Sequence, residues 1–296
     1  MSSGVAPRRV IILGHTGFIG RALQAHFEHS DLEVHGFSSA TLDLRQAAAL
    51  ARLDGYIDPA SCLIVTSASS PGSAMTPAAL ADNVAMIANL ATHLETHPVQ
   101  TCVYLSSDAV YPMLDEAVTE TTATDFSSLY ALSKLAAERL LEHATRKSGA
   151  ALTVLRPTAV YGPGDTHNGY GPNRFARSIA SERAVRLFGQ GEETRDHLYI
   201  DDLVQAVARL SLEGQSGVFN IATGSSHSFL AVAELLRESA PYAVEIVTSP
   251  RQSAVTHRRF DVSHLRAALP AFEFTPLGVG LAATLAAATQ AAGVRS

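Results

Sequence analysis

Three residues in the middle of the chain have the types and spacing of a group that moves hydroxyl protons. Tyr130 and Lys134 are four residues apart, so a helix beginning near residue 129 would present both side chains on one face. A tyrosine with a pKa of about 10 is a poor acid–base group at neutral pH, and a nearby ammonium favours its phenolate. Ser107 follows a predicted strand, 101–106, and can hydrogen-bond the same substrate oxygen. We predict that Ser107, Tyr130 and Lys134 form a catalytic triad.

A glycine-rich loop lies at the end of the first predicted strand. Gly14, Gly17 and Gly20 come directly after strand 10–13 and lead into a helical segment, 20–29. Such a loop lets the backbone approach a diphosphate, and the following helix presents free N–H groups to it. The spacing is G-x-x-G-x-x-G rather than G-x-G-x-x-G. We interpret the loop as a nicotinamide dinucleotide site in which Lys134 can also hold the nicotinamide ribose.

The second predicted strand, 33–37, is not followed by an acidic residue. Sites specific for NAD usually place Asp or Glu there, against the adenosine ribose. This chain instead has Ser38 and Ser39, which can donate hydrogen bonds to the 2′-phosphate of NADP. Asp43 and Leu44 can contact the adenine. NAD and NADP both stay open as cofactors, with NADP slightly favoured.

The elements that position these residues alternate between strands and helices. Strands are predicted at 10–13, 33–37, 62–67, 101–106, 152–155 and 218–222, and helices at 20–29, 77–96, 129–146, 174–183, 201–212 and 228–239, with a further strand at 184–187. Strands separated by helices form parallel βαβ units, so we expect an α/β fold with a Rossmann-type, doubly wound sheet. Residues 1–160 are the expected cofactor domain, to which 200–222 return. Residues 161–296 are expected to form a smaller, partly interleaved substrate lobe.

Composition narrows the class of protein. Of the 296 residues, 47% are hydrophobic and 17% charged, which excludes a disordered chain. The net charge of −6 gives no general attraction to nucleic acid or to an anionic membrane, so neither is an expected partner. The histidines form no recognised metal-ligand pattern, and no metal is expected.

The ends of the chain and its cysteines point to the cytoplasm. The first apolar run is too short for a signal peptide, and the Ala-rich segment 277–296 is interrupted by Gly, Thr and Gln, so we expect a packed terminal helix. Cys62 and Cys102 adjoin apolar runs and are predicted to be buried thiols in a reducing compartment.

Together these motifs resemble the extended short-chain dehydrogenase/reductase family, in its NAD-dependent epimerase/dehydratase branch. The resemblance covers nearly the whole chain and includes Asp82-Asn83-Val84, Leu155-Arg156-Pro157, segments 160–164, 172–175, 188–191 and 194–202, and Phe219-Asn220-Ile221-Ala222. It implies further cofactor contacts from Phe18, Ile19, Ser67, Ala68, Asn83, Ser106, Tyr130, Lys134, Pro157 and Val160.

The family's smaller lobe holds a nucleotide-diphosphate sugar. The resemblance therefore implies that Asn173 and Arg195 contact the diphosphate, with Arg258 or Arg259 as a second cation, because arginine offers a permanently charged fork to phosphate oxygens. For Arg195 the alternative is a surface ion pair with Asp196 or Asp201. Asp108, next to Ser107, is a further expected substrate contact.

Two departures from the family pattern bear on the reaction. Ala159 stands where the family usually has Asn, which removes one expected substrate contact. Asp108 is followed by Ala109, whereas the dehydratases carry Asp-Glu, so no evident base remains for water elimination. A dehydratase is therefore not expected.

The expected activity is that of a nucleotide-sugar epimerase that forms a keto-sugar intermediate, with Tyr130 as the acid–base group. The alternative is an NADPH-dependent keto-sugar reductase, which the short interval between the second strand and Asp43 keeps open. A non-catalytic NAD(P)-binding regulator is a third possibility. A homodimer through helices 77–96 and 129–146 is expected, because 77–96 is apolar around most of its circumference. A monomer with Ala-rich surface helices is the alternative.

Overall fold

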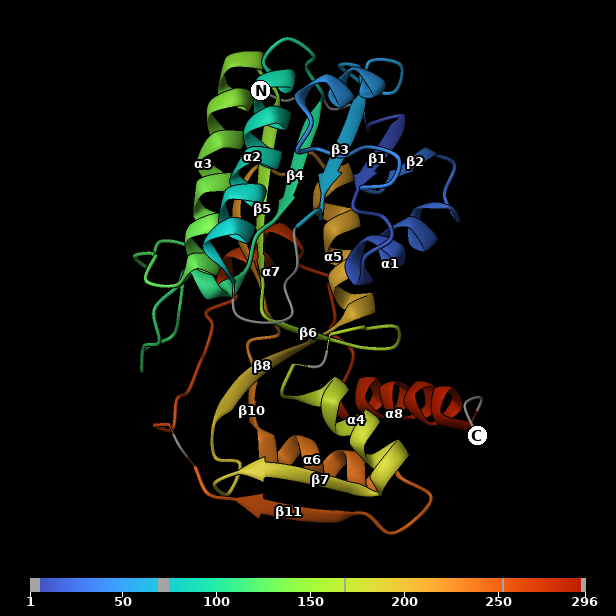
Figure 1. Ribbon diagram of the computed structural model, residues 1–296, viewed down its shortest axis with the longest axis vertical. Coiled ribbons are helices and arrows are strands. Elements are labelled where there is room, and N and C mark those ends of the chain that lie inside the picture. The colour runs from blue at the N-terminus through green and yellow to red at the C-terminus, as the bar shows by residue number, and fades with distance from the viewer. Residues whose placement is uncertain (1–5, 69–74, 168, 252, 294–296) are drawn as a thin grey trace.

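A six-stranded parallel sheet forms the centre of the larger lobe (Figure 1). The computed structural model describes residues 6–68, 75–167, 169–251 and 253–293. The sheet has the order β2-β1-β3-β4-β5-β9, with β1 (Arg9–Leu13), β2 (Glu33–Phe37), β3 (Ser61–Val65), β4 (Thr101–Leu105), β5 (Ala151–Pro157) and β9 (Gly217–Ile221). β3 and β4 are buried along their whole length, because helices cover both faces of the sheet.

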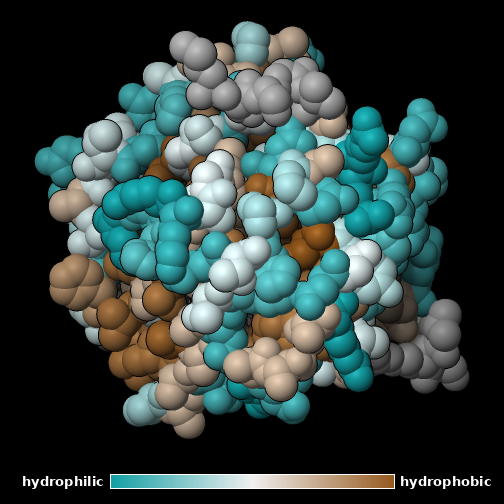
Figure 2. Space-filling view, turned by 90° about the horizontal axis from the view of Figure 1, so that it is seen from above, coloured by the Kyte–Doolittle hydropathy of each residue, from teal (hydrophilic) through white to brown (hydrophobic). Residues whose placement is uncertain are grey.

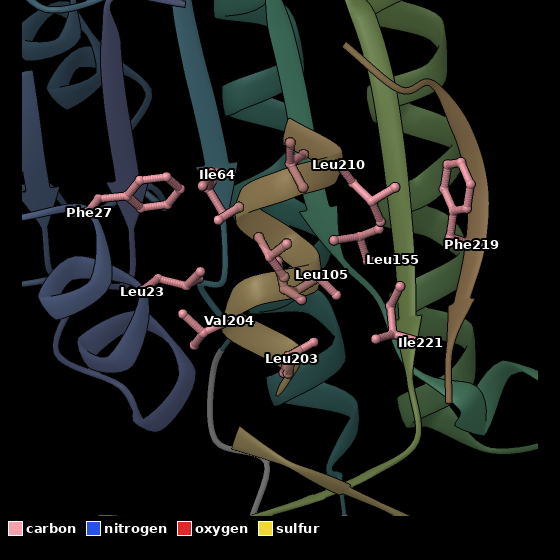
Figure 3. Close-up of a cluster of buried hydrophobic side chains, with 14 of the residues drawn as sticks. Leu23, Phe27, Ile64, Leu105, Leu155, Leu203, Val204, Leu210, Phe219 and Ile221 are labelled. Carbon is pink, nitrogen blue, oxygen red and sulfur yellow. The ribbon is translucent and has the colours of Figure 1, made fainter. Parts of the chain in front are cut away.

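Helices cover the sheet on both faces. One face packs against α1 (Phe18–Phe27) and α5 (Ile200–Leu212), with α7 (Ser263–Ala268) beside β9. Figure 3 shows this core, where Leu23 of α1 and Val204 of α5 lie close to Ile64 of β3. The other face packs against α2 (Pro77–Leu94), α3 (Leu129–Ser148) and the 3₁₀ helix η1 (Ala47–Leu53).

The smaller lobe is built around its own apolar core. β7 (Ala184–Phe188) pairs in parallel with β11 (Glu245–Ser249), and α4 (Pro172–Glu182), α6 (Phe229–Ser239) and α8 (Leu277–Gly293) surround them. A three-stranded sheet joins the lobes, with the order β10-β8-β6. Its strands are β6 (Ala159–Tyr161), β8 (Thr194–Tyr199) and β10 (Ser226–Ser228), and a short 3₁₀ helix, η2 (Asp108–Val110), follows β4.

The expected α/β fold with a parallel Rossmann-type sheet is confirmed, and the predicted strands and helices lie within a few residues of the observed ones. Residues 200–222, which were predicted to return to the larger lobe, form α5 and β9. A later segment returns to this lobe as well, since Leu265 and Leu269 also pack in its core. Strands β6, β8, β10 and β11 were not predicted, because they are short or carry polar and charged residues.

Within the described residues the sheet has six strands, as does a dinucleotide-binding sheet of order 3-2-1-4-5-6, but no strand lies beyond β2. β2 is the last strand on its side, because the described residues 38–60 form turns and η1 instead of a full helix and another strand. This explains the short interval between the second strand and Asp43.

The other expectations on buried segments also hold. Cys62 and Cys102 are free and buried, and burial raises the pKa of both thiols to about 12. The terminal helix α8 is packed through Leu281 and Leu285, and residues 294–296 lie outside the described part. Within that part, no helix is both long and apolar enough to cross a bilayer.

Candidate active site

A cleft of about 820 Å³ opens at the carboxyl ends of the central strands, between the two lobes. Its wall includes residues that directly follow β3, β4 and β5, together with the first turn of α1. β1 lies between β2 and β3, so the next strand in the chain, β2, is on one side of β1 and the later strands β3 to β5 are on the other. Ligands of open α/β sheets bind at such a switch in strand order.

The glycine loop fits a dinucleotide diphosphate. Gly14 has a φ of 92°, and a Cβ atom on Gly20 would lie 2.2 Å from the Gly14 carbonyl oxygen, so only glycine allows this approach of loop and helix. Gly17, the N-cap residue of α1, supplies no side-chain cap, and Phe18 and Ile19 in the first turn line the cleft. The N–H groups at this helix end therefore face a space that an anion can occupy.

The predicted triad lines one wall of the cleft. Ser128 accepts a hydrogen bond from Ala131 N (3.0 Å) and begins α3, which places Tyr130 and Lys134 in its first two turns. Ser107 follows β4 and caps η2, accepting from Ala109 N (3.1 Å). The structure thus brings Ser107, Tyr130 and Lys134 to the same wall.

The electrostatics of the triad differ from the expectation that Lys134 lowers the pKa of Tyr130. The Lys134 ammonium donates to the Leu105 carbonyl oxygen (2.8 Å) and lies 5.8 Å from the centroid of the Tyr130 ring. Burial raises the pKa of Tyr130, against a hydrogen bond with Ser107 that lowers it. Burial also lowers the pKa of Lys134 to about 8. Tyr130 is therefore a protonated phenol at neutral pH in this state.

Two guanidinium groups also line the cleft. Arg195 on β8 donates to the carbonyl oxygens of Thr194 (2.8 Å) and Thr256 (2.9 Å). Arg258 donates to the Asp108 carbonyl oxygen (2.6 Å) and lies 3.5 Å from the Asp108 carboxylate. Burial lowers the pKa of Arg195, and the neighbouring Arg258 lowers it further.

The alternative ion pair of Arg195 with Asp196 is not observed. The Asp196 carboxylate instead accepts from the backbone N–H groups of Thr223 (3.0 Å) and Gly224 (2.8 Å). The residues that line the cleft thus include three cations, Lys134, Arg195 and Arg258, and two carboxylates, Asp108 and Asp165. Burial raises the pKa of Asp108. This charge balance suits a diphosphate.

Asn173 also lines the cleft, but its amide is engaged. Its carbonyl oxygen accepts from Gly162 N (3.1 Å) and its amino group donates to Asp165 (2.7 Å). In this structure Asn173 therefore holds the 162–165 loop in place.

The structure does not bring every predicted residue to the cleft. The cofactor and substrate candidates that line it are Gly17, Phe18, Ile19, Gly20, Ala68, Ser106, Ser107, Asp108, Tyr130, Lys134, Pro157, Val160, Asn173, Arg195 and Arg258. Those that do not are Gly14, Ser38, Ser39, Asp43, Leu44, Ser67, Asn83 and Arg259. Ser39 and Asp43 line a separate cavity of about 470 Å³, and Leu44 is buried. Their cofactor roles stay predictions.

A buried ionic network behind the triad was not recognised from the sequence. Arg156 forms a two-pronged ion pair with Glu138, with Nε–Oε1 at 3.0 Å and Nη2–Oε2 at 2.6 Å. Glu138 also accepts from the Ser106 hydroxyl, and Arg156 donates to the Tyr111 hydroxyl (2.8 Å). The Leu155-Arg156-Pro157 motif was visible, but its partner on α3 is recognisable only once the chain is folded.

His197 is a second residue to which sequence reasoning gave no role. It is 4% exposed, it lines the cleft beside Arg195, and neither ring nitrogen forms a hydrogen bond with any described residue. Burial lowers its pKa to about 3, so the ring is neutral.

Known proteins resemble the chain in sequence and in structure. GDP-6-deoxy-D-mannose reductase of Pseudomonas aeruginosa is 30% identical over 276 residues, which cover 88% of this chain and 89% of that protein. UDP-glucose 4-epimerase of Thermus thermophilus, in complex with NAD, has a TM-score of 0.83 at 22% identity over 95% of this chain and 98% of its own. RMD of Pseudomonas aeruginosa, in complex with NADPH, has a TM-score of 0.82 at 24% identity over 96% and 99%.

The model of the NAD dependent epimerase/dehydratase family matches residues 10–222, from the first strand of the sheet to the residue after β9. This range contains the glycine loop, the triad and Arg195, the residues on which the resemblance was first based. The chain therefore belongs to the NAD dependent epimerase/dehydratase family and is an NAD(P)-dependent enzyme of the extended short-chain dehydrogenase/reductase type.

Proposed function

We propose that this enzyme reduces a keto group on a nucleotide-diphosphate sugar. The observation that carries the proposal is one cleft that combines the triad, an uncapped helix end and the guanidinium groups of Arg195 and Arg258. A dinucleotide and a sugar diphosphate each need a site for their phosphates. The N-terminus of α1 suits the first, and the guanidinium groups of Arg195 and Arg258 suit the second.

The chain's own residues supply the proton and the orientation. When bound, the nicotinamide provides the hydride chemistry at the sugar carbon. Tyr130, held as a phenol by burial, donates its proton to the sugar carbonyl oxygen, and the Ser107 hydroxyl hydrogen-bonds the same oxygen. The Lys134 ammonium, fixed by the Leu105 carbonyl oxygen, keeps positive charge beside the developing phenolate.

We favour reduction, although the sequence alone favours epimerisation. The GDP-6-deoxy-D-mannose reductase matches this chain almost end to end. The lack of an acidic residue after β2 agrees with NADPH as the cofactor. Epimerisation uses the same groups and is the alternative.

The test is to offer GDP-, dTDP- and UDP-linked sugars and 4-keto-sugars with NADPH or NADH and to follow reduced nicotinamide and products together. Net oxidation of NADPH is expected, with conversion of the keto group of the nucleotide-linked sugar into a hydroxyl group. An inverted sugar without net cofactor consumption would establish the epimerase instead. Tight cofactor binding with no product from any of these substrates would indicate a non-catalytic NAD(P)-binding regulator.

Arg195→Ala is expected to raise the KM for the nucleotide sugar by at least about tenfold, because a charge-assisted contact to phosphate is lost. The KM for the cofactor should stay unchanged. Arg186→Ala, an exposed arginine on β7 outside the cleft, is the matched control. An unchanged sugar KM in Arg195→Ala would contradict the phosphate role.

We further propose the homodimer through α2 and α3. The two helices lie against one another on one face of the sheet, and Leu132 on α3 is 38% exposed. Light scattering at micromolar concentration should give twice the 31.3 kDa monomer mass. A monomer mass across that range would exclude the dimer.

A further inference from the structure

A cluster of metal-binding side chains lies at the edge of the larger lobe remote from the cleft. His93 lies in the last turn of α2, His97 lies three residues beyond the end of this helix, and Asp54 caps the end of η1. α2 runs from the cleft to the opposite edge of the sheet (Figure 1). That end of the molecule, seen from above in Figure 2, carries many hydrophilic residues, with a group of hydrophobic ones at the lower left. The cluster is therefore separate from the triad.

The donor atoms of the three residues converge. One ligand atom from each lies within 4.8 Å of the others, with His93 Nε2 at 3.2 Å and His97 Nε2 at 3.7 Å from Asp54 Oδ1. Ligand atoms about 2.1 Å from a tetrahedral ion lie roughly 3.4 Å from one another. The observed spacings are close to this value.

The contact between His93 and Asp54 is not a hydrogen bond, although it is short. His93 Nε2 is buried and makes no hydrogen bond within the described residues, and the His93 side chain is only 10% exposed. A buried ring nitrogen aimed at a carboxylate without bonding to it suits a shared ion between them. Burial and the neighbouring His97 lower the pKa of His93, which favours the neutral ring that a metal requires.

The second histidine is already oriented as a ligand. His97 Nδ1 lies 3.1 Å from the His93 carbonyl oxygen, so donation there leaves Nε2 as the free lone pair facing the cluster. Metal-bound histidines usually donate their other N–H group in this way. The two imidazole rings are stacked, with centroids 4.1 Å apart, which brings both Nε2 atoms to the same side.

We propose that Asp54, His93 and His97 bind a divalent transition-metal ion of the zinc class. Two imidazoles and one carboxylate form the ligand set that suits Zn²⁺, and the 48% exposure of the Asp54 side chain leaves room for water as a fourth ligand. The ion would tie η1 to the end of α2 and stabilise the fold without taking part in the reaction at the cleft.

The experiment uses tag-free full-length protein that has been stripped with EDTA and titrated with ZnCl₂ against a chromophoric chelator. We expect one Zn²⁺ per chain and an affinity at least about 100-fold lower in His97→Ala, because a ligand is lost. His97 is 41% exposed, so this variant should fold. Asp54→Asn, which removes the anionic ligand from an exposed position, provides a second variant.

The matched control is His143→Ala, which removes a histidine that is 74% exposed and outside the cluster. Zn²⁺ should raise the Tm of the wild type and of His143→Ala, but not that of His97→Ala. The proposal would be overturned if the wild type bound Zn²⁺ no more tightly than His97→Ala does. It would also be overturned if His143→Ala lost as much Zn²⁺ affinity as His97→Ala.

Discussion

Replacing Tyr130 by Phe is expected to lower kcat by at least about 100-fold, because general acid–base catalysis typically contributes that much or more. Phe keeps the packing of the ring in the cleft wall but removes the oxygen that carries the proton. Cofactor binding should be unchanged, since the glycine loop and Lys134 are untouched. Steady-state kinetics and cofactor titration by fluorescence measure the two quantities.

The matched control for this variant is Tyr104→Phe. Tyr104 on β4 is buried, and the centroid of its ring lies 5.2 Å from the Lys134 ammonium. Unlike Tyr130, Tyr104 does not line the cleft. Its hydroxyl should therefore contribute little to turnover. Tyr130→Phe activity within tenfold of the wild type would remove Tyr130 from the proton-transfer role.

Replacing Glu138 by Leu is expected to lower the free energy of unfolding by about 3–5 kcal/mol, because it leaves the buried Arg156 guanidinium without its counter-charge. Both side chains are buried, with 7% and 6% exposure, so water cannot replace the lost carboxylate. Urea unfolding followed by circular dichroism measures the loss.

Two controls separate the buried ion pair from a general effect of changing α3. Glu142→Gln, on the same helix, breaks exposed pairs with Arg139 and Arg146 and should cost less than about 1 kcal/mol. Adding Arg156→Met to Glu138→Leu removes the unpaired charge and should restore much of the stability. A Glu138→Leu loss no larger than that of Glu142→Gln would show that the ion pair is unimportant.

The sequence could predict the sheet and the triad because their signals are local. The β-branched runs identify the buried strands, and the four-residue spacing of Tyr130 and Lys134 needs only a helix to bring them together. The end of a parallel strand is also a fixed place in this fold, so Ser107 after β4 could be assigned to the site.

What the sequence did not predict depends on contacts between distant segments. Glu138 pairs with Arg156 across the α3–β5 interface, and nothing near Glu138 in sequence marks it as buried. Asp54 is distant from His93 and His97 in the sequence, so the cluster of these three side chains is recognisable only in the folded chain. The position of the Lys134 ammonium likewise depends on the fold, since it donates to the Leu105 carbonyl oxygen at the end of β4.

The position of α5 in the chain has a consequence for the protein as it is made. Strands β1 to β5 are complete once residue 157 has been synthesised, yet α5, which covers one face of them, ends only at residue 212. At roughly 5–20 residues per second, Leu155 stays without its α5 neighbours for some seconds, while Ile64 is covered only by α1. The nascent chain is therefore most exposed to aggregation, and to capture by chaperones, in the interval before α5 leaves the ribosome.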